Sequence, residues 1–411
     1  MTPTSGKGPL DGLTVLDLSK VLAGPWSTQV LGDLGAQVLK VELPGVGDET
    51  RRWGPPFLED GSNDAAYYLA ANRNKQGLAI NIATPEGADL IRQLVAKADI
   101  LVENFKVGAL ARYGLDYAAL SAIKPDLIYC SITGFGQEGP HAQRGGYDFL
   151  VQGMSGLMSV TGFPDDQGGA PTKVGIPVSD LFTGLYATIS ILAALNHRNG
   201  SGEGQHIDCA LLDTQMALLA NQASNYLNGG MVPGRLGNEH PNVVPYQDFA
   251  TSDGHILVAI GTDKQLRDFC TLIGMPALGR HADFATNAGR SVNRRALQAA
   301  LGPALSQWTS ADLLAAMKAN NLPGGPVNSV PQALDDPQVK ARGLIQGFER
   351  DGCTIRTLAY PARLSRTPAT YRHPPPVRGA DTFKVLSAYL GLSNEQMGAL
   401  AAQGIIEDCP R

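Results

Sequence analysis

The fold is decided by residues 14–42, TVLDLSKVLAGPWSTQVLGDLGAQVLKVE. The apolar run TVLDLS predicts a strand, the segment LAGP a loop, and QVLKVE a second strand. Between the loop and the second strand, residues 26–34 have the spacing of a helix. A strand, a helix and a second strand in this order predict one βαβ unit with parallel strands.

The same alternation continues along the next part of the chain. GLAINI (77–82), DILVEN (99–104) and DLIYCSI (126–132) read as further strands. A helix is expected to open on Pro85, and shorter helices are expected near residues 108–113 and 116–123. We therefore predict an α/β protein with a Rossmann-like, doubly wound parallel sheet.

The composition of the chain changes after residue 225. Residues 226–330 read as a smaller mixed α/β domain, in which PYQDFATSDGHILVAI predicts a hairpin that turns at Asp253 and Gly254. Residues 331–411 are too few to fold alone, so we expect them to return to the large domain, which residues 1–225 begin. A long helix is expected from residue 214 to about 230.

Charge and hydropathy exclude several classes of protein. The 411 residues are 43% hydrophobic and 17% charged, which is typical of a folded globular protein. A net charge of −5 disfavours a general nucleic-acid binder, and the apolar stretch 181–195 is short for a membrane span, so it reads as a buried helix. The first residues lack the pattern of a secretory signal, which indicates a cytoplasmic protein.

Two glycine patterns raise the possibility of a nucleotide-binding protein. The loop KVLAGPW lacks the G-x-G-x-x-G fingerprint of dinucleotide-binding folds, so a bound nicotinamide cofactor is disfavoured. A literal G-x-G-x-x-G occurs at Gly134, Gly136 and Gly139, but Pro140 stands where a phosphate-binding helix would begin. These glycines are expected to shape a loop that approaches a ligand or another backbone segment closely.

The segment KVGIPVSDLFTGLY places Asp180 at the start of an apolar helix, with Ser179 as the expected N-cap. Aspartate is common at helix starts because free N–H groups and the helix dipole stabilise its charge. The same environment would keep a carboxylate ionised as a nucleophile beside a substrate. Position alone leaves both interpretations open.

Five long segments in order together resemble the class III CoA-transferase family, also called the CaiB/BaiF family. The resemblance covers nearly the whole chain. The segments are LDGLTVLDLSKVLAGP (10–25), GAQVLKVELPGVGDETR (35–51), TPEGADLIRQLVAKADILVENFKVGAL (84–110), GYDFLVQGMSGLMSVTG (146–162) and VGIPVSDLFTGLYATISILAAL (174–195).

This resemblance implies that Asp180 is the nucleophile. Its carboxylate would form a mixed anhydride with the acyl group of an acyl-CoA and then an aspartyl-CoA thioester, from which a free acid takes CoA. CoA and acyl-CoA would be substrates, with no tightly bound cofactor and no metal. The family also contains α-methylacyl-CoA racemases, which use a His where this chain has Tyr147. Tyrosine is a poor base near neutral pH, so transferase chemistry is favoured and Tyr147 is expected to have a supporting role.

The resemblance also implies a CoA-binding set. Arg112 is the best candidate for a phosphate contact, while Leu43 replaces a basic residue of some members, a loss for which Arg51 or Arg52 could compensate. The positions that match the CoA contacts of the family are Val21, Leu22, Ile80, Ala83, Asn104, Phe105, Lys106, Arg112, Gly145 and Gly146.

The segment GNEHPNVVPYQDF (237–249) resembles members that use succinyl-CoA with dicarboxylates such as glutarate. It implies that Asn238 and His240 lie near the acyl pocket. A formyl-CoA:oxalate-type transferase is an alternative, disfavoured because such enzymes carry an extended glycine-rich loop before this point; a racemase or isomerase is a further alternative. The family fold implies an interlocked homodimer.

Overall fold

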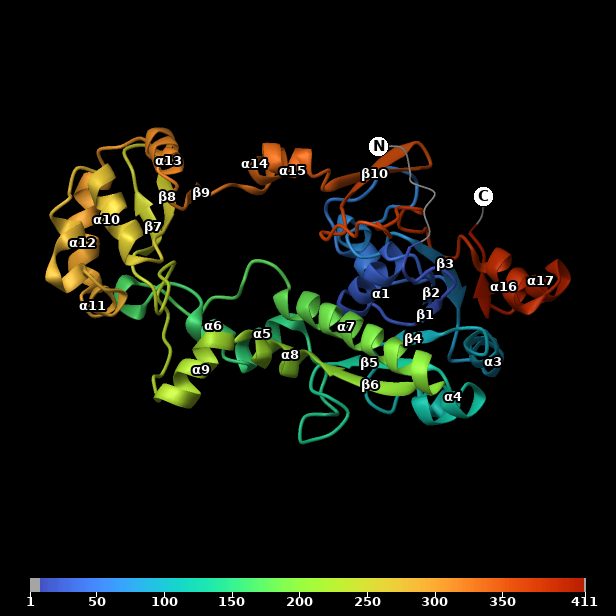
Figure 1. The fold of residues 1–411 in the computed structure, drawn as a ribbon. Coiled ribbons are helices and arrows are strands. Elements are labelled where there is room, and N and C mark those ends of the chain that lie inside the picture. Colours follow the sequence, from blue (N-terminus) through green and yellow to red (C-terminus); the bar gives the residue numbers. More distant parts are fainter. Residues whose placement is uncertain (1–7, 410–411) are drawn as a thin grey trace. The chain divides into compact units, whose positions relative to one another are not determined.

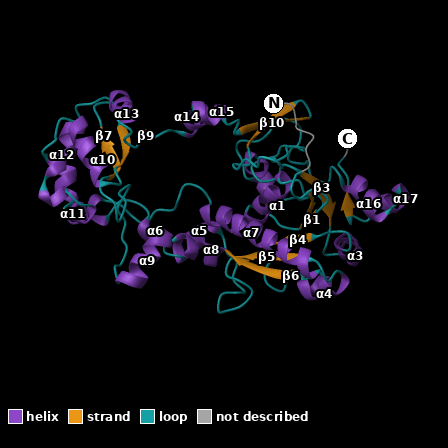
Figure 2. Cartoon of the chain, in the orientation of Figure 1, coloured by secondary structure: helices purple, strands orange, loops and turns teal. Residues whose placement is uncertain are grey.

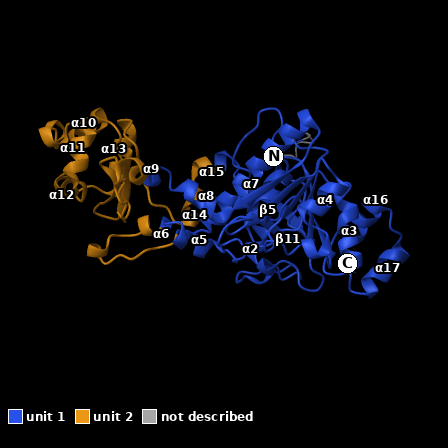
Figure 3. Cartoon of the chain, turned by 90° about the horizontal axis from the view of Figure 1, so that it is seen from below, with its two compact units in different colours: residues 1–157, 174–223, 340–411 blue, residues 158–173, 224–339 orange. Residues whose placement is uncertain are grey.

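A computed structural model describes residues 8–409 of the chain, which form two compact units (Figure 3). The first unit comprises the described part of residues 1–157 together with 174–223 and 340–411. The second comprises residues 158–173 and 224–339. The second unit thus ends beyond the expected boundary at residue 330 and includes an earlier segment, and the C-terminal segment returns to the first unit as expected.

The first unit contains a seven-stranded sheet in the order β12-β3-β2-β1-β4-β5-β6 (Figures 1 and 2). All neighbouring strands are parallel except β12, which pairs antiparallel with β3. The order from β3 to β6 is that of a doubly wound Rossmann-like sheet, as predicted. The strands are β1 (Thr14–Asp17), β2 (Gln37–Glu42), β3 (Lys75–Ile80), β4 (Ile100–Glu103), β5 (Ile128–Thr133), β6 (Gln205–Ala210) and β12 (Ile406–Glu407).

Helices cover both faces of this sheet, because successive strand residues point to opposite sides and are apolar on both. In β1, Leu16 belongs to the core beneath α3 (Pro85–Val95), α4 (Tyr117–Ile123), α16 (Thr382–Leu390) and α17 (Asn394–Ala402). Its neighbour Val15 belongs to the core beneath α1 (Ala23–Asp33), α5 (Asp148–Met154) and α7 (Val178–Ser201).

Two expected helices differ in the structure. The long helix expected after residue 213 is two helices, α8 (Leu211–Leu218) and α9 (Ala220–Gly229), because Ala220 has a φ of 39° and interrupts the helical backbone. The helix expected near residues 108–113 is a single 3₁₀ turn, Ala111–Tyr113. The unit also contains α2 (Ala66–Leu69), a 3₁₀ turn at Glu49–Arg52 and the hairpin of β10 (Ile345–Arg350) and β11 (Cys353–Leu358).

The second unit contains a three-stranded antiparallel sheet with its own apolar core. β7 (Tyr246–Ala250) and β8 (His255–Ala259) form the predicted hairpin, and β9 (Gly324–Pro326) pairs with β8. The helices that contribute to this core are α10 (Asp263–Leu272), α12 (Arg294–Leu305) and α13 (Ser310–Ala319), and α11 (Asn287–Val292) packs against α12. Short helices α6 (Leu157–Val160), α14 (Val330–Asp335) and α15 (Pro337–Ala341) lie at or near the points where the chain passes between the units.

Helix α7 is a core element of the first unit. It is the one helix among the described residues that is long and apolar enough to cross a membrane by length and composition. In this fold it packs against α1, α5, α8, β5 and β6. Its side chains Ala187, Ile191 and Leu195 are buried against the sheet, but Phe182 and Ile189 are exposed. The stretch 181–195 is therefore buried on one face only, whereas a buried helix was expected.

Candidate active site

The predicted CoA-binding residues lie at one edge of the parallel sheet. Val21 and Leu22 follow β1, while Asn104, Phe105 and Lys106 follow β4. Strands β1 and β4 are neighbours at the point where the strand order reverses, which is where doubly wound sheets bind ligands. Asn104 joins the two loops: its Oδ1 accepts from the Lys20 N–H at 2.9 Å, and its Nδ2 donates to the Lys20 carbonyl at 2.7 Å.

A buried charge network fixes the loop after β1. Val21 has a φ of 69°, a conformation that costs energy in a β-branched residue. Its N–H donates to the carboxylate of Asp48, which is paired with the Lys40 ammonium at 3.0 Å. Lys40 also donates to the Ser19 carbonyl at 3.0 Å. These contacts hold the strained loop in the one conformation that presents Val21 and Leu22 at the sheet edge.

The remaining predicted CoA contacts differ in what they can offer a ligand. The side chain of Ile80 is buried in the core, so only its backbone is available. Ala83 is exposed beyond the end of β3, and Lys106 is exposed beyond the end of β4. Arg112 is exposed, with its guanidinium carbon 4.6 Å from the centre of the Tyr113 ring. Their contacts with CoA stay predictions.

Arg51 cannot replace the basic side chain that the position of Leu43 lacks. Its guanidinium is buried and bonded to the carboxylates of Glu42 and Asp64, with the Tyr68 hydroxyl as a further partner. Arg52 is exposed and lines a cavity of about 350 Å³. Of the two arginines, only Arg52 is therefore placed to meet a phosphate.

The glycine pattern at 134–139 serves a close contact between backbone segments. A Cβ on Gly134 would lie 2.5 Å from the Cα of Gly146, and a Cβ on Gly146 would lie 2.4 Å from the Cα of Gly134. Both positions therefore require glycine. This contact fixes the loop that carries Gly145, Gly146 and Tyr147 against the end of β5.

Asp180 lies in the first turn of α7, but its helix is not capped as expected. The N-cap residue is Pro177, and Ser179 lies inside the helix, where its hydroxyl donates to Gln215 Oε1 at 2.8 Å. The prediction that Ser179 caps the helix is therefore wrong. The capping oxygen is Oδ1 of Asp148 on α5, which accepts the N–H groups of Ser179 at 2.7 Å and of Asp180 at 3.3 Å.

The environment of Asp180 changes the charge behaviour of its carboxyl group. Burial, followed by the nearby negative charge of Asp148, raises the pKa of Asp180 to about 7. Burial and the charges of Asp180 and Asp148 raise the pKa of Tyr67 to about 12. Tyr67 therefore lies within electrostatic range of Asp180 and keeps its proton at neutral pH.

Sequence reasoning did not single out Tyr67. It lies in α2 beside Tyr68, which is fully buried, and its ring packs edge-on against Trp53 with the ring centres 5.3 Å apart. A tyrosine in the run AAYYLAA gives no signal that separates a core side chain from one that faces a reacting group.

Helix α7 packs closely on the start of α1 through Gly184, one turn beyond Asp180. A Cβ at Gly184 would lie 2.6 Å from the Ala23 carbonyl and 3.2 Å from the Trp26 ring. Residues four apart lie on the same helix face, so Asp180 and the start of α1 belong to one neighbourhood. A carboxylate of raised pKa thus lies close to the sheet edge that is expected to bind CoA.

A family model described as CoA-transferase family III matches residues 10–382. The chain belongs to this family. It is 49% identical over 385 residues to a succinate–glutarate CoA-transferase of Agrobacterium fabrum, covering 93% of this chain and 96% of the relative. It is 40% identical over 402 residues to the human succinyl-CoA:glutarate CoA-transferase, covering 97% and 90%. A crystal structure of a CaiB/BaiF family protein from Brucella suis is 47% identical, with a TM-score of 0.83, covering 93% of this chain and 100% of that chain.

Three further predicted site residues of this CoA-transferase have defined local surroundings. Tyr147 precedes α5 and is 66% exposed. In the second unit, Asn238 donates to Asp248 at 3.1 Å, and His240 accepts the N–H groups of Asn242 and Val243 on Nδ1. Its Nδ1 is therefore unprotonated, and Nε2 carries the proton of the neutral ring. The expected roles of Tyr147, Asn238 and His240 stay predictions.

Within residues 8–409, no group of three or more His, Cys, Asp or Glu side chains could hold a metal ion. The chemistry available to this CoA-transferase from the described groups is that of a basic carboxylate and a neutral hydroxyl.

Proposed function

We propose that this chain transfers CoA from succinyl-CoA to glutarate with Asp180 as the nucleophile. The observation that carries the proposal is the carboxylate of raised pKa at the start of α7, a helix that packs one turn further on, at Gly184, against the start of α1. The choice of substrates is supported by the names of two relatives, a succinate–glutarate CoA-transferase and a succinyl-CoA:glutarate CoA-transferase.

The reaction consists of four substitutions at carbonyl carbons. An Asp180 oxygen attacks the succinyl-CoA thioester carbon, the C–S bond breaks, and CoA thiolate leaves behind a mixed anhydride. The thiolate then attacks Cγ of Asp180, succinate leaves, and an aspartyl-CoA thioester remains. A glutarate carboxylate attacks this thioester and expels CoA thiolate, which attacks the glutaryl carbonyl carbon to give glutaryl-CoA and restore Asp180. No net proton is gained or lost.

The raised pKa serves this mechanism. A carboxylate whose conjugate acid has a pKa of about 7 is more basic than an ordinary aspartate, and a more basic oxygen is a better nucleophile toward a thioester. The hydroxyl of Tyr67 keeps its proton and is available to donate to an oxygen that becomes negative during attack. No second base stands at the position of Tyr147, which disfavours a racemase.

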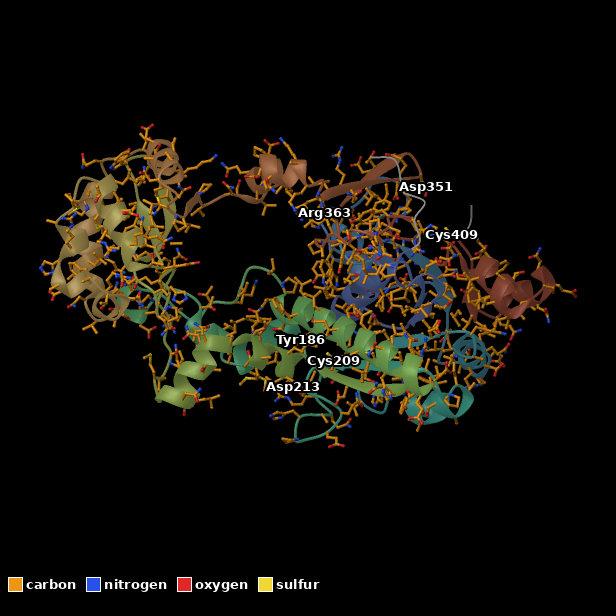
Figure 4. All side chains as sticks on the ribbon, in the orientation of Figure 1. Tyr186, Cys209, Asp213, Asp351, Arg363 and Cys409 are labelled. Carbon is orange, nitrogen blue, oxygen red and sulfur yellow. The ribbon has the colours of Figure 1, made fainter. Side chains whose placement is uncertain are left out.

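We also propose that the enzyme is an interlocked homodimer. Support comes from an exposed apolar stripe on α7, which would be covered if a second copy packed there. Figure 4 labels Tyr186, one of its members, on this helix. The exposed side chains of the stripe, spaced three or four residues apart, are Phe182, Leu185, Tyr186 and Ile189.

The reaction is tested by incubating the protein with succinyl-CoA and a panel of acids, including glutarate and oxalate, and identifying the thioester products by mass spectrometry. Glutaryl-CoA is expected to form fastest. Oxalyl-CoA as the main product would overturn the choice of acceptor, and deuterium uptake at an α-carbon without exchange would indicate a racemase.

The nucleophile is tested with Asp180→Ala and with Asp213→Asn as a matched control on α8. Loss of the attacking carboxylate is expected to reduce exchange by roughly 10³-fold or more, whereas Asp213→Asn retains full activity. Undiminished exchange in Asp180→Ala, with product identity unchanged, would sink the proposed mechanism.

A further inference from the structure

Asp148 uses both carboxylate oxygens to organise the start of the nucleophile helix. Its Oδ1 accepts from the backbone N–H of Ser179 at 2.7 Å and of Asp180 at 3.3 Å. Its Oδ2 accepts from Nε2 of Gln152 at 2.6 Å. The two backbone bonds join α5 directly to the residue that is expected to react.

Gln152 extends this connection to the chain that enters α7. Its side chain is fully buried, and its Oε1 accepts the Val174 N–H at 2.9 Å. Asp148 and Gln152 lie four residues apart on α5 and therefore share one helix face. Together they hold the entering segment and the first turn of α7, which leaves the Asp180 backbone little freedom to shift.

We propose that Asp148 is a positioning residue for CoA transfer, which fixes the backbone of Asp180 through the first-turn N–H groups and places a second carboxylate near its side chain. The inference rests on the proposed role of Asp180 as nucleophile. Asparagine, serine or threonine would cap a helix equally well, so the cap alone does not explain an aspartate here. A second carboxylate beside the nucleophile keeps that nucleophile basic.

No other charged group competes for this role among the described residues. Burial is the largest cause of the raised pKa of Asp180, and the charge of Asp148 is the second. Tyr67 on α2 interacts electrostatically with both Asp180 and Asp148 and carries a neutral hydroxyl. On the elements packed against α7, Asp33 pairs with Arg73, and Asp208 accepts from the Gln137 N–H. The other ionisable side chains on α7, α8, β6 and β5 are Tyr186, His197, Arg198, Asp213, His206, Cys209, Tyr129 and Cys130.

Three variants separate the charge from the cap. Asp148→Asn keeps an acceptor oxygen for the two backbone N–H groups but removes the charge and the acceptor for Gln152 Nε2. Asp148→Ala removes the charge and both acceptors, and Asp213→Asn removes an exposed charge on α8 (Figure 4). The measurement is kcat/KM for succinyl-CoA between pH 5 and 9 with a fixed acceptor acid, with circular dichroism to establish that each variant is folded.

The wild-type profile is expected to rise with pH through about 7, because only ionised Asp180 attacks. In Asp148→Asn the rising part of the pH profile moves to lower pH by about one unit. The value of kcat/KM at its plateau falls, because a less basic carboxylate is a weaker nucleophile. Asp148→Ala shows the same displacement with a plateau roughly tenfold lower still, since the backbone of Asp180 is released. Asp213→Asn superimposes on the wild type.

If the rising part of the pH profile of Asp148→Asn coincides with that of the wild type, the role of the charge is overturned. If the Asn and Ala variants reach the same plateau value of kcat/KM, the role of the cap is overturned. If Asp148→Ala does not fold, the Asn variant still decides the charge. The carboxyl ¹³C shift of Asp180, assigned with Asp180→Asn, reports its titration without any turnover. A lower titration midpoint in Asp148→Asn, combined with an active Asp180→Ala, would retain the coupling and reject the proposed function.

Discussion

At the scale of single residues, the raised pKa of Asp180 makes its carboxylate a better nucleophile, but the ionised carboxylate makes the fold less stable. Its folded-state pKa of about 7 lies above the usual value of 3.8, so the native state binds this proton more tightly than the unfolded state. The stability that this group contributes is complete below pH 4 and is lost as the pH rises through 7. Asp180→Asn, which cannot ionise, is therefore expected to melt at a higher temperature than the wild type at pH 8.

The two melting temperatures should converge as the pH falls toward 4, which differential scanning calorimetry can follow. Asp213→Asn serves as the exposed control and should track the wild type throughout. A variant Asp180→Asn that is less stable than the wild type at pH 8 would show that the ionised carboxylate is favourably bound in the fold. That result would contradict a pKa of Asp180 raised by burial of its carboxyl group.

The sequence singles out Asp180 as the expected nucleophile, but it does not indicate which residue holds the backbone of Asp180 in place. The ordered motifs around residues 174–195 single out the aspartate, whereas the nearest hydroxyl, Ser179, is the wrong cap. The right cap, Asp148, is separated from Ser179 by 31 positions and is brought there by the packing of α5 on α7. Capping rules describe neighbours along the chain, so an acceptor supplied by another helix lies outside them.

At the scale of elements, the close packing of α1 on α7 depends on Gly184. A methyl group there would meet the Ala23 carbonyl and the Trp26 ring, so Gly184→Ala must push the two helices apart. We expect a loss of about 1–3 kcal/mol in the free energy of unfolding, as for other overpacked sites. We also expect a higher KM for succinyl-CoA, because α1 begins directly after the loop of Val21 and Leu22.

The same helix provides the control for this substitution. Gly200 lies in the last turn of α7 with open space around it, so Gly200→Ala should leave KM unchanged and stabilise the helix by up to about 0.5 kcal/mol. Thermal unfolding and steady-state kinetics on both variants make the comparison. Equal effects of the two substitutions would show that helix propensity, and not the contact with α1, controls this site.

Patterns of apolar residues predicted elements well where many residues share one periodicity. The parallel strands follow from short apolar runs, and α3 follows from its helical spacing and from Pro85 at the helix start. The break between α8 and α9 depends on one backbone angle at Ala220, a residue whose side chain favours helix everywhere. Tertiary packing overrides such a propensity, and the sequence holds no local sign of it.

At the scale of the whole molecule, the sequence predicts that the C-terminal segment belongs to the large domain. It does not predict which strand of the sheet this segment pairs with. The expectation from segment length was that residues 331–411 would return to the large domain, whereas residues 340–411 belong to the first unit. They do so partly through β12, a strand of two residues that pairs antiparallel with β3. A strand this short has no alternation to detect, because its pairing is decided by the sheet edge that it meets.

From the apolar stripe on α7 we expect a dimer that does not dissociate on dilution. Ile189 is 60% exposed in the single chain, and its neighbours Leu185 and Phe182 are also exposed, so the stripe would be costly to leave in water. Sedimentation is expected to give twice the 43.3 kDa of one chain down to nanomolar concentration, since interlocked chains separate only by unfolding.

Ile189→Glu should lower the yield of dimer or its melting temperature, because a charge would have to be buried against the partner. Ile123→Glu, at an exposed isoleucine on α4 outside the stripe, should leave both unchanged. A wild-type protein that becomes monomeric on dilution while it stays folded would contradict interlocking. An Ile189→Glu variant indistinguishable from Ile123→Glu would place the subunit contact elsewhere, because a covered stripe cannot accept a charge without loss of stability.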